Sequence, residues 1–191
     1  MSCRRWHGSG VIFPRCLCIQ HCKHIFIDLG ANRGVHGRFL FEPGFYRNAR
    51  LMHEIFNRTY GTNRSNYMTY GFAFEPNPAH HQRLDTLQKV YNKFKWPYFV
   101  FLFGVSDYFG KATFHTNFEP DANGTERHHF WGFSTSLKRP QYSRAIELRV
   151  VEFPTWLGRL LSCFLHPSKG IMNRKIEMKM DIVGQELCII P

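Results

Sequence analysis

A glycine-containing turn directly after an apolar run is the first segment that could do chemistry. The run HIFIDLG (24–30) contains Asp28, and the residues ANRG that follow place Gly30, Asn32 and Gly34 in one short turn. Where such a turn connects a buried strand to the start of a helix, glycines let the backbone pass close to a ligand. Free backbone N–H groups there bind negative charge. We interpret this turn as one side of a nucleoside site.

A second acidic residue, Glu75, ends the next expected strand in the segment FEPNP. An acid at this place commonly accepts hydrogen bonds from ribose hydroxyls. Glu75 follows Asp28 by 75 − 28 = 47 positions, more than the about 20 of the simple dinucleotide fingerprint. A helix expected over 47–60 accounts for the difference. The alternative is that both acids are ordinary strand-end carboxylates near solvent, but the glycine turn between them favours the nucleoside site.

The elements that must position these residues follow from the spacing of apolar side chains. It predicts strands over 24–30, 67–74, 98–105, 146–153 and 175–183, and helices over 34–42, 47–60, 79–95 and from Pro154 onwards. Asn77 suits the helix N-cap, with Pro78 at the first helical position. We expect a small extra strand over 111–116 and a long loop over 117–145. Alternating strands and helices predict an α/β fold with a mostly parallel sheet.

The last predicted strand, KIEMKMDIV (175–183), alternates strictly. Its apolar side holds Ile176, Met178, Met180 and Ile182, and its polar side holds Lys175, Glu177, Lys179 and Asp181. This pattern indicates partial exposure, whereas a central parallel strand is usually apolar on both faces. The pattern therefore fits a strand at an exposed edge of the sheet better than a central strand.

Composition limits the function classes only broadly. The 191 residues are 43% hydrophobic and carry a formal charge of +11, which favours anionic partners. Basic residues such as Arg38, Arg47, Lys93 and Lys95 are scattered along the sequence, so nucleic-acid binding is the less favoured interpretation. No apolar run approaches the roughly 20 residues of a transmembrane helix.

Residues 1–22 are expected to form a poorly ordered, basic, Cys-containing tail, and residues 23–191 one domain. Cysteines and histidines gather around the end of this tail, at Cys16, Cys18, His21, Cys22 and His24. They lack the matching downstream pair of a structural zinc site, so we expect no protein-bound metal. We find no clear targeting segment and expect a cytoplasmic protein.

Four segments together resemble a known family. IFIDLGANRG, FAFEPNP, FGVSDYFGKATF and MKMDIVGQE occur in the order found in FkbM-type S-adenosylmethionine-dependent methyltransferases, and the resemblance covers roughly residues 24–190. It implies a Rossmann-like class I methyltransferase fold, S-adenosyl-L-methionine as cofactor, and O-methylation of a hydroxyl on a small molecule or glycan. The alternative is a non-catalytic Rossmann-like module that acts through binding.

The resemblance also implies roles for single residues. Asp28, Gly30 and Gly34, in the turn that includes Asn32, would hold the methionine end of the cofactor, and Glu75 would bind its ribose. Ser106 and Asp107 would lie beside the adenine. Asp181 is the candidate catalytic base, or alternatively a structural strand-end acid, and Glu186 is the weaker candidate.

The sequence departs from the family pattern in two places. Val183 stands where the family usually has the first glutamate of Asp-x-Glu-Gly-x-Glu. The chain also ends soon after the segment that resembles the fourth core strand, so the resemblance implies a sheet that is incomplete on its C-terminal side, with an exposed edge that a partner could cover. Both departures affect the side of the site where a methyl acceptor would bind.

Overall fold

The computed structural model describes residues 22–62, 69–120, 126–135, 143–165 and 173–182. Its first sheet has four parallel strands in the order β3-β2-β1-β8. These are β1 (His24–Leu29), β2 (Thr69–Phe74), β3 (Tyr98–Phe101) and β8 (Lys175–Met180). The predicted α/β fold with a mostly parallel sheet is confirmed at this level.

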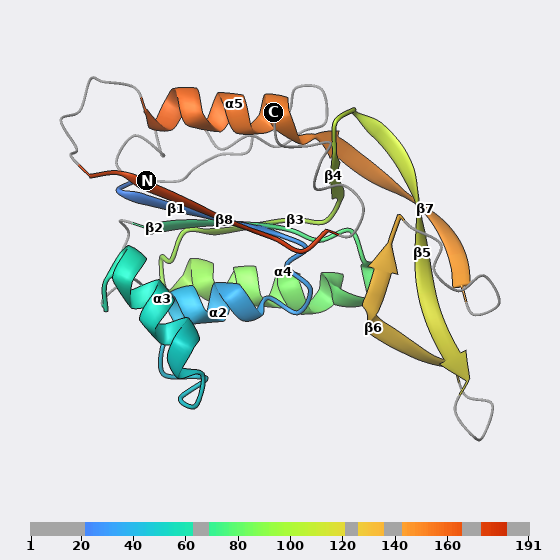
Figure 1. Ribbon diagram of the computed structural model, residues 1–191, viewed down its shortest axis with the longest axis horizontal. Coiled ribbons are helices and arrows are strands. Elements are labelled where there is room, and N and C mark those ends of the chain that lie inside the picture. Colours follow the sequence, from blue (N-terminus) through green and yellow to red (C-terminus); the bar gives the residue numbers. More distant parts are fainter. Residues whose placement is uncertain (1–21, 63–68, 121–125, 136–142, 166–172, 183–191) are drawn as a thin grey trace.

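Helices cover both faces of the first sheet (Figure 1). One face carries α2 (Val35–Phe41), α3 (Arg50–Tyr60) and α4 (Pro78–Lys93), and the other carries α5 (Phe153–Phe164). The predicted start of α4 is confirmed, because the Asn77 side chain accepts a hydrogen bond from the Ala79 N–H at 3.0 Å and Pro78 follows it.

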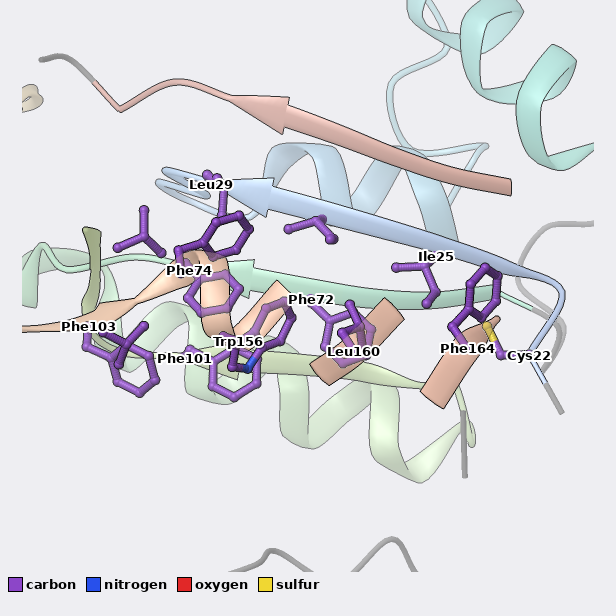
Figure 2. Close-up of a cluster of buried hydrophobic side chains, with 14 residues drawn as sticks. Cys22, Ile25, Leu29, Phe72, Phe74, Phe101, Phe103, Trp156, Leu160 and Phe164 are labelled. Atoms are coloured by element: carbon purple, nitrogen blue, oxygen red, sulfur yellow. The ribbon is translucent and has the colours of Figure 1, made fainter. Parts of the chain in front are cut away.

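Two aromatic-rich cores hold these layers together. On the α5 side, Figure 2 shows Ile25 and Leu29 of β1 with the rings of Phe72, Phe74 and Trp156. On the other side, alternate strand residues such as Phe26 and Tyr98 pack against the three helices. Because neighbouring residues of a strand point to opposite faces, β1 is apolar on both faces between His24 and Asp28.

A second sheet corrects two predictions. The predicted strand 98–105 divides into β3 and β4 (Gly104–Ser106), and the predicted loop 117–145 contains strands. The second sheet has the order β4-β7-β5-β6, with β5 (Gly110–Pro120), β6 (Glu126–Ser134) and β7 (Ser143–Glu152). β5 pairs antiparallel with both β6 and β7, so backbone pairing satisfies the N–H and C=O groups of this polar stretch. The stretch lacks the apolar pattern from which strands are predicted, and its strands were therefore missed.

The strand order creates a switch point between β1 and β8. From β1 the chain adds β2 and then β3 on one side, and it later returns to place β8 on the other side of β1. Ligands of open α/β sheets bind beyond the carboxyl ends of the strands at such a point. Within the described part of the chain β8 pairs with β1 alone, so it is the edge strand that the sequence predicts.

The predicted tail lies outside the described residues apart from Cys22. Cys22 is buried in the α5-side core, and its thiol donates a hydrogen bond to the carbonyl oxygen of His24 at 2.8 Å. No helix in the described ranges is both long and apolar enough to cross a bilayer. Nor do these ranges bring together three His, Cys, Asp or Glu side chains that could hold a metal ion.

Candidate functional site at the carboxyl ends of β1 and β2

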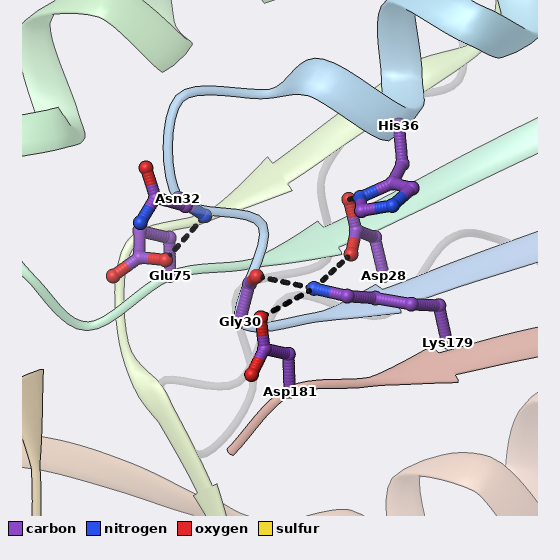
Figure 3. A network of polar contacts seen from close by, with 7 residues as sticks. All are labelled: Asp28, Gly30, Asn32, His36, Glu75, Lys179 and Asp181. Atoms are coloured by element: carbon purple, nitrogen blue, oxygen red, sulfur yellow. Dashed lines mark hydrogen bonds and ion pairs between the residues drawn. The ribbon is translucent and has the colours of Figure 1, made fainter. Parts of the chain in front are cut away.

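Asp28, one residue before the end of β1, is fully buried and lies beside the side chain of Lys179 (Figure 3). The parallel register aligns Asp28 with Lys179 of β8, so both side chains leave the sheet on the same face. The Lys179 Nζ lies 3.2 Å from Asp28 Oδ1 and donates a hydrogen bond to the carbonyl oxygen of Gly30 at 2.8 Å. It also lies 3.6 Å from Asp181 Oδ2. One ammonium therefore joins β1, the turn after it, and the end of β8.

Burial dominates the electrostatics of Asp28. It raises the pKa of the Asp28 carboxyl above its ordinary value, and the nearby charges of Lys179 and His36 oppose that rise. His36, on the first turn of α2, places Nδ1 3.7 Å from Asp28 Oδ2. Burial lowers the pKa of His36, and the Asp28 charge acts against this. Lys179 is therefore the main counter-charge for Asp28.

The turn after β1 has positive φ at Gly30, Asn32 and Gly34. A Cβ on Gly30 would lie 2.2 Å from the carbonyl oxygen of Asp181, and one on Gly34 would lie 2.8 Å from Cδ2 of Leu87. The close approach at these two glycines is therefore made by the protein's own backbone and side chains. The turn is tied to β2 by the N–H groups of Gly30 and Ala31, which each donate to the carbonyl oxygen of Phe74 at 3.0 Å.

Glu75, directly after β2, is buried and connects three segments. Its Oε2 accepts a hydrogen bond from the Asn32 N–H at 2.6 Å, and its Oε1 accepts one from the Asn77 N–H at 2.8 Å. Burial raises the pKa of Glu75 to about 7, although both hydrogen bonds act in the opposite direction. Glu75 thus fixes the turn after β1 to the start of α4 and lies at the same sheet edge as Asp28.

Of the two candidate bases, the structure describes Asp181 only. Asp181 follows β8, and its N–H donates to the carbonyl oxygen of Leu29 at 2.9 Å. Its side chain is 68% exposed, so its carboxylate reaches solvent beside Lys179. Glu186 lies outside the described residues, as does Val183.

Ser106 and Asp107 are placed at the end of β4, in the second sheet. The buried Ser106 hydroxyl donates a hydrogen bond to Asp107 Oδ1 at 3.1 Å. Among the described residues, no hydrogen bond or ion pair joins Ser106 or Asp107 to Asp28, Glu75 or Lys179. Their expected place beside an adenine ring stays a prediction.

Sequence reasoning missed Lys179 and His36. It assigned Lys179 to a partly exposed polar side of the last strand, whereas its side chain is only 23% exposed and its ammonium points at the buried Asp28. The sequence signal for Lys179 was its two-residue spacing from Asp181, because residues two apart in an extended segment lie on the same side. His36 carried a weaker signal, because it falls just after the glycine turn, in the first turn of the next helix.

The site combines two carboxylates that a polar ligand could use, those of Glu75 and Asp181, with the buried carboxylate of Asp28. Each Glu75 oxygen already accepts one N–H and retains a second lone pair for a hydroxyl donor. Among the residues that the structure describes, neither oxygen of Asp28 has a hydrogen-bond donor in addition to its ion pairs with Lys179 and His36. Asp181 supplies an accessible carboxylate. This set suits a ligand that carries hydroxyls and a cationic group.

Comparison with known proteins assigns no family. No protein-family model, no curated protein and no solved structure matches this chain. The function is therefore inferred from the residues at the carboxyl ends of β1, β2 and β8.

Proposed function

We propose that the protein is an S-adenosylmethionine-dependent methyltransferase of the FkbM type with a class I fold. Its acceptor would be a hydroxyl of a small molecule or glycan. One observation carries the proposal. Asp28 and Glu75 lie at the carboxyl ends of adjacent parallel strands, joined through the turn that holds Asn32, beside the switch point between β1 and β8. This is where open α/β sheets bind nucleoside ligands.

The described residues fit such a cofactor at its ribose and at its cationic end. The free lone pairs of Glu75 suit the two ribose hydroxyls, and Asp28, buried and paired with Lys179, would support the methionine end through the turn after β1. The bound cofactor supplies a methyl group that is already activated on a sulfonium. The protein therefore has mainly to align the acceptor hydroxyl with that group.

Asp181 is the residue proposed to take the proton of the acceptor hydroxyl. Its carboxylate is exposed at the sheet edge, where an acceptor could reach it, and Lys179 lies 3.6 Å away. The proton would pass from the hydroxyl oxygen to the Asp181 carboxylate as the oxygen gains the methyl group. Lys179 would hold the carboxylate toward the site through its contacts with Asp28 and Gly30.

A second candidate function is a non-catalytic module that binds a ligand or a partner. Two observations favour it. The carbonyl oxygen of Asp181 occupies the space over Gly30, and Lys179 already neutralises Asp28. Both features reduce the room that a donor and an acceptor would share at this edge.

Calorimetric titration with S-adenosylhomocysteine tests the cofactor site. We expect binding by the wild type and at least about tenfold weaker binding by Glu75→Ala, because the substitution removes charge-assisted hydrogen bonds to the ribose. The matched control is Asp85→Ala, which removes an exposed carboxylate of α4 that pairs with Lys89 on the same helix. Absence of binding by folded wild-type protein would overturn the cofactor claim.

A methyl-transfer assay separates the two candidate functions. With a panel of hydroxyl acceptors and labelled donor, an enzyme incorporates label, and Asp181→Asn lowers its rate at neutral pH without abolishing cofactor binding. Cofactor binding without incorporation into any acceptor would instead support the non-catalytic module.

A further inference from the structure

Aromatic and basic side chains form a surface at the opposite edge of the first sheet. Helices of a parallel sheet run against the strands, so the ends of α2 and α4 lie where the strands begin (Figure 1). We define the aromatic–basic patch by its members around these helix ends, which are Arg38, Phe45, Arg47, Lys93, Phe94, Lys95 and Trp96.

Contacts connect the two aromatic parts of the patch. Phe94 stacks on Trp96 with ring centroids 5.0 Å apart, and Trp96 lies 5.3 Å from Tyr91. The Tyr91 hydroxyl donates to Glu42 Oε1 at 2.5 Å. Glu42 then pairs with Arg38 at 3.8 Å, and the Arg38 guanidinium lies 4.4 Å from the centre of the Phe45 ring. A chain of contacts through the buried Tyr91 therefore joins the two parts of the patch, which come from residues 38–47 and 93–96.

The patch combines exposed apolar rings with exposed basic side chains. Phe45 and Phe94 are 56% and 61% exposed, which is unusual for two large apolar rings on one patch. Arg47, Lys93 and Lys95 beside them are exposed as well. Glu42, an acid next to the patch, is already engaged by Arg38 and Tyr91. Exposed apolar rings are thus surrounded by positive charge that the neighbouring acid does not neutralise.

We propose that the aromatic–basic patch docks on an anionic lipid bilayer. Phenylalanine rings have no polar atom, so they gain free energy by entering the boundary between headgroups and acyl chains. Lysine and arginine at the rim attract anionic headgroups, and the two signals together give stable peripheral binding. The formal charge of +11 acts in the same direction over the whole molecule.

The ring environments favour lipid over nucleic acid. Arg38 lies over one face of the Phe45 ring and Trp96 stacks on one face of Phe94, so each ring keeps a single face on which a base could stack. Leu51, in the first turn of α3 after the Phe45 loop, is 69% exposed and offers no stacking face at all. A bilayer contacts apolar side chains such as Leu51 without any need for stacking.

Vesicle sedimentation with the full chain tests the proposal. We expect binding to phosphatidylcholine vesicles that contain phosphatidylserine, little binding to phosphatidylcholine alone, and release by salt. Phe45→Ser combined with Phe94→Ser should weaken binding at least about tenfold. Lys93→Gln combined with Lys95→Gln should weaken it about thirtyfold.

Two matched controls lie in the second sheet and its turns. Phe109→Ser removes a ring of similar exposure, 54%, and Lys111→Gln removes a lysine whose charge Glu147 already balances. Both should bind anionic vesicles like the wild type, and thermal unfolding should show that every variant is folded. Equal binding to neutral vesicles, no binding to anionic vesicles, or equal weakening by the controls would overturn the proposal. Binding of a single-stranded oligonucleotide in place of vesicles, weakened by the patch variants, would also overturn it. None of these results depends on cofactor binding.

Discussion

The Nζ of Lys179 lies 3.2 Å from Oδ1 of the fully buried Asp28, across the boundary between β8 and β1. An ionised carboxylate at that depth needs a counter-charge, because its desolvation is costly. The same ammonium holds the carbonyl oxygen of Gly30 and lies near Asp181. This ion pair therefore supports the stability of the edge strand and the shape of the candidate site at the same time.

Lys179→Met should destabilise the protein by about 3 kcal/mol near pH 8, because it leaves Asp28 buried without its main counter-charge. Without Lys179, the folded-state pKa of Asp28 should rise further above its unfolded value. The sign follows from this shift: the loss of stability shrinks as pH falls through the raised pKa, because a neutral carboxyl is easier to bury. Urea unfolding at about pH 8 and about pH 5 measures both effects.

Lys175→Met is the control for this experiment, since Lys175 is exposed on the same strand and the same face. It should change stability by no more than about 0.5 kcal/mol. A further Asp28→Asn substitution in the Lys179→Met background should recover part of the loss. Equal, pH-independent losses in the two lysine variants would argue against the role of the ion pair.

Glu75→Gln should remove part of the pH dependence of folding. Burial raises the pKa of Glu75 from 4.5 to about 7, so the folded state binds more protons than the unfolded state between these values. The contribution of Glu75 to stability is therefore greatest at acidic pH and falls, by about 3 kcal/mol, as pH rises from about 4.5 through about 7. Unfolding free energies measured across this range should show a smaller slope in the variant. An unchanged slope would show that Glu75 does not titrate in this window.

Gly30→Ala should disturb the end of β8, because the new Cβ would meet the Asp181 carbonyl oxygen and the residue would keep a φ of +76°. We expect a loss of at least about 2 kcal/mol in thermal or urea unfolding. Gly44→Ala is the matched control, since a Cβ there meets nothing within 4 Å. Equal tolerance of the two substitutions would mean that β8 does not pack on the turn in this way.

Tyr98→Phe should leave stability unchanged or raise it by about 1 kcal/mol. The Tyr98 hydroxyl is buried and has no hydrogen-bond partner among the described residues, and its ring lies in the space left by Gly37 and Gly71. Removing an unsatisfied buried hydroxyl removes its desolvation cost. Differential scanning calorimetry measures the change, and a clear loss of stability would point to a water or side chain that satisfies this hydroxyl.

Local sequence patterns were sufficient for the first sheet and its helices. The helix start at Asn77 and Pro78, the apolar run that ends at Asp28, and the apolar side of β8 depend on neighbouring residues only. The second sheet was missed for the opposite reason. β5 pairs with strands whose partners lie up to 40 residues away, and its polar sequence carries no apolar alternation to indicate them.

The sequence by itself determined the strand ends that bear Asp28 and Glu75 and the turn between them, because strands, turns and caps follow from local composition. Only the tertiary structure decided that Lys179 neutralises Asp28 and holds the Gly30 carbonyl. These contacts join residues 151 and 149 positions apart, and they depend on the parallel register of β1 and β8. The tertiary structure likewise brought Arg38, Lys93 and Lys95 near the exposed rings of Phe45 and Phe94. Spacing along a chain does not report the meeting of side chains from distant segments, because that meeting is set by how the layers pack.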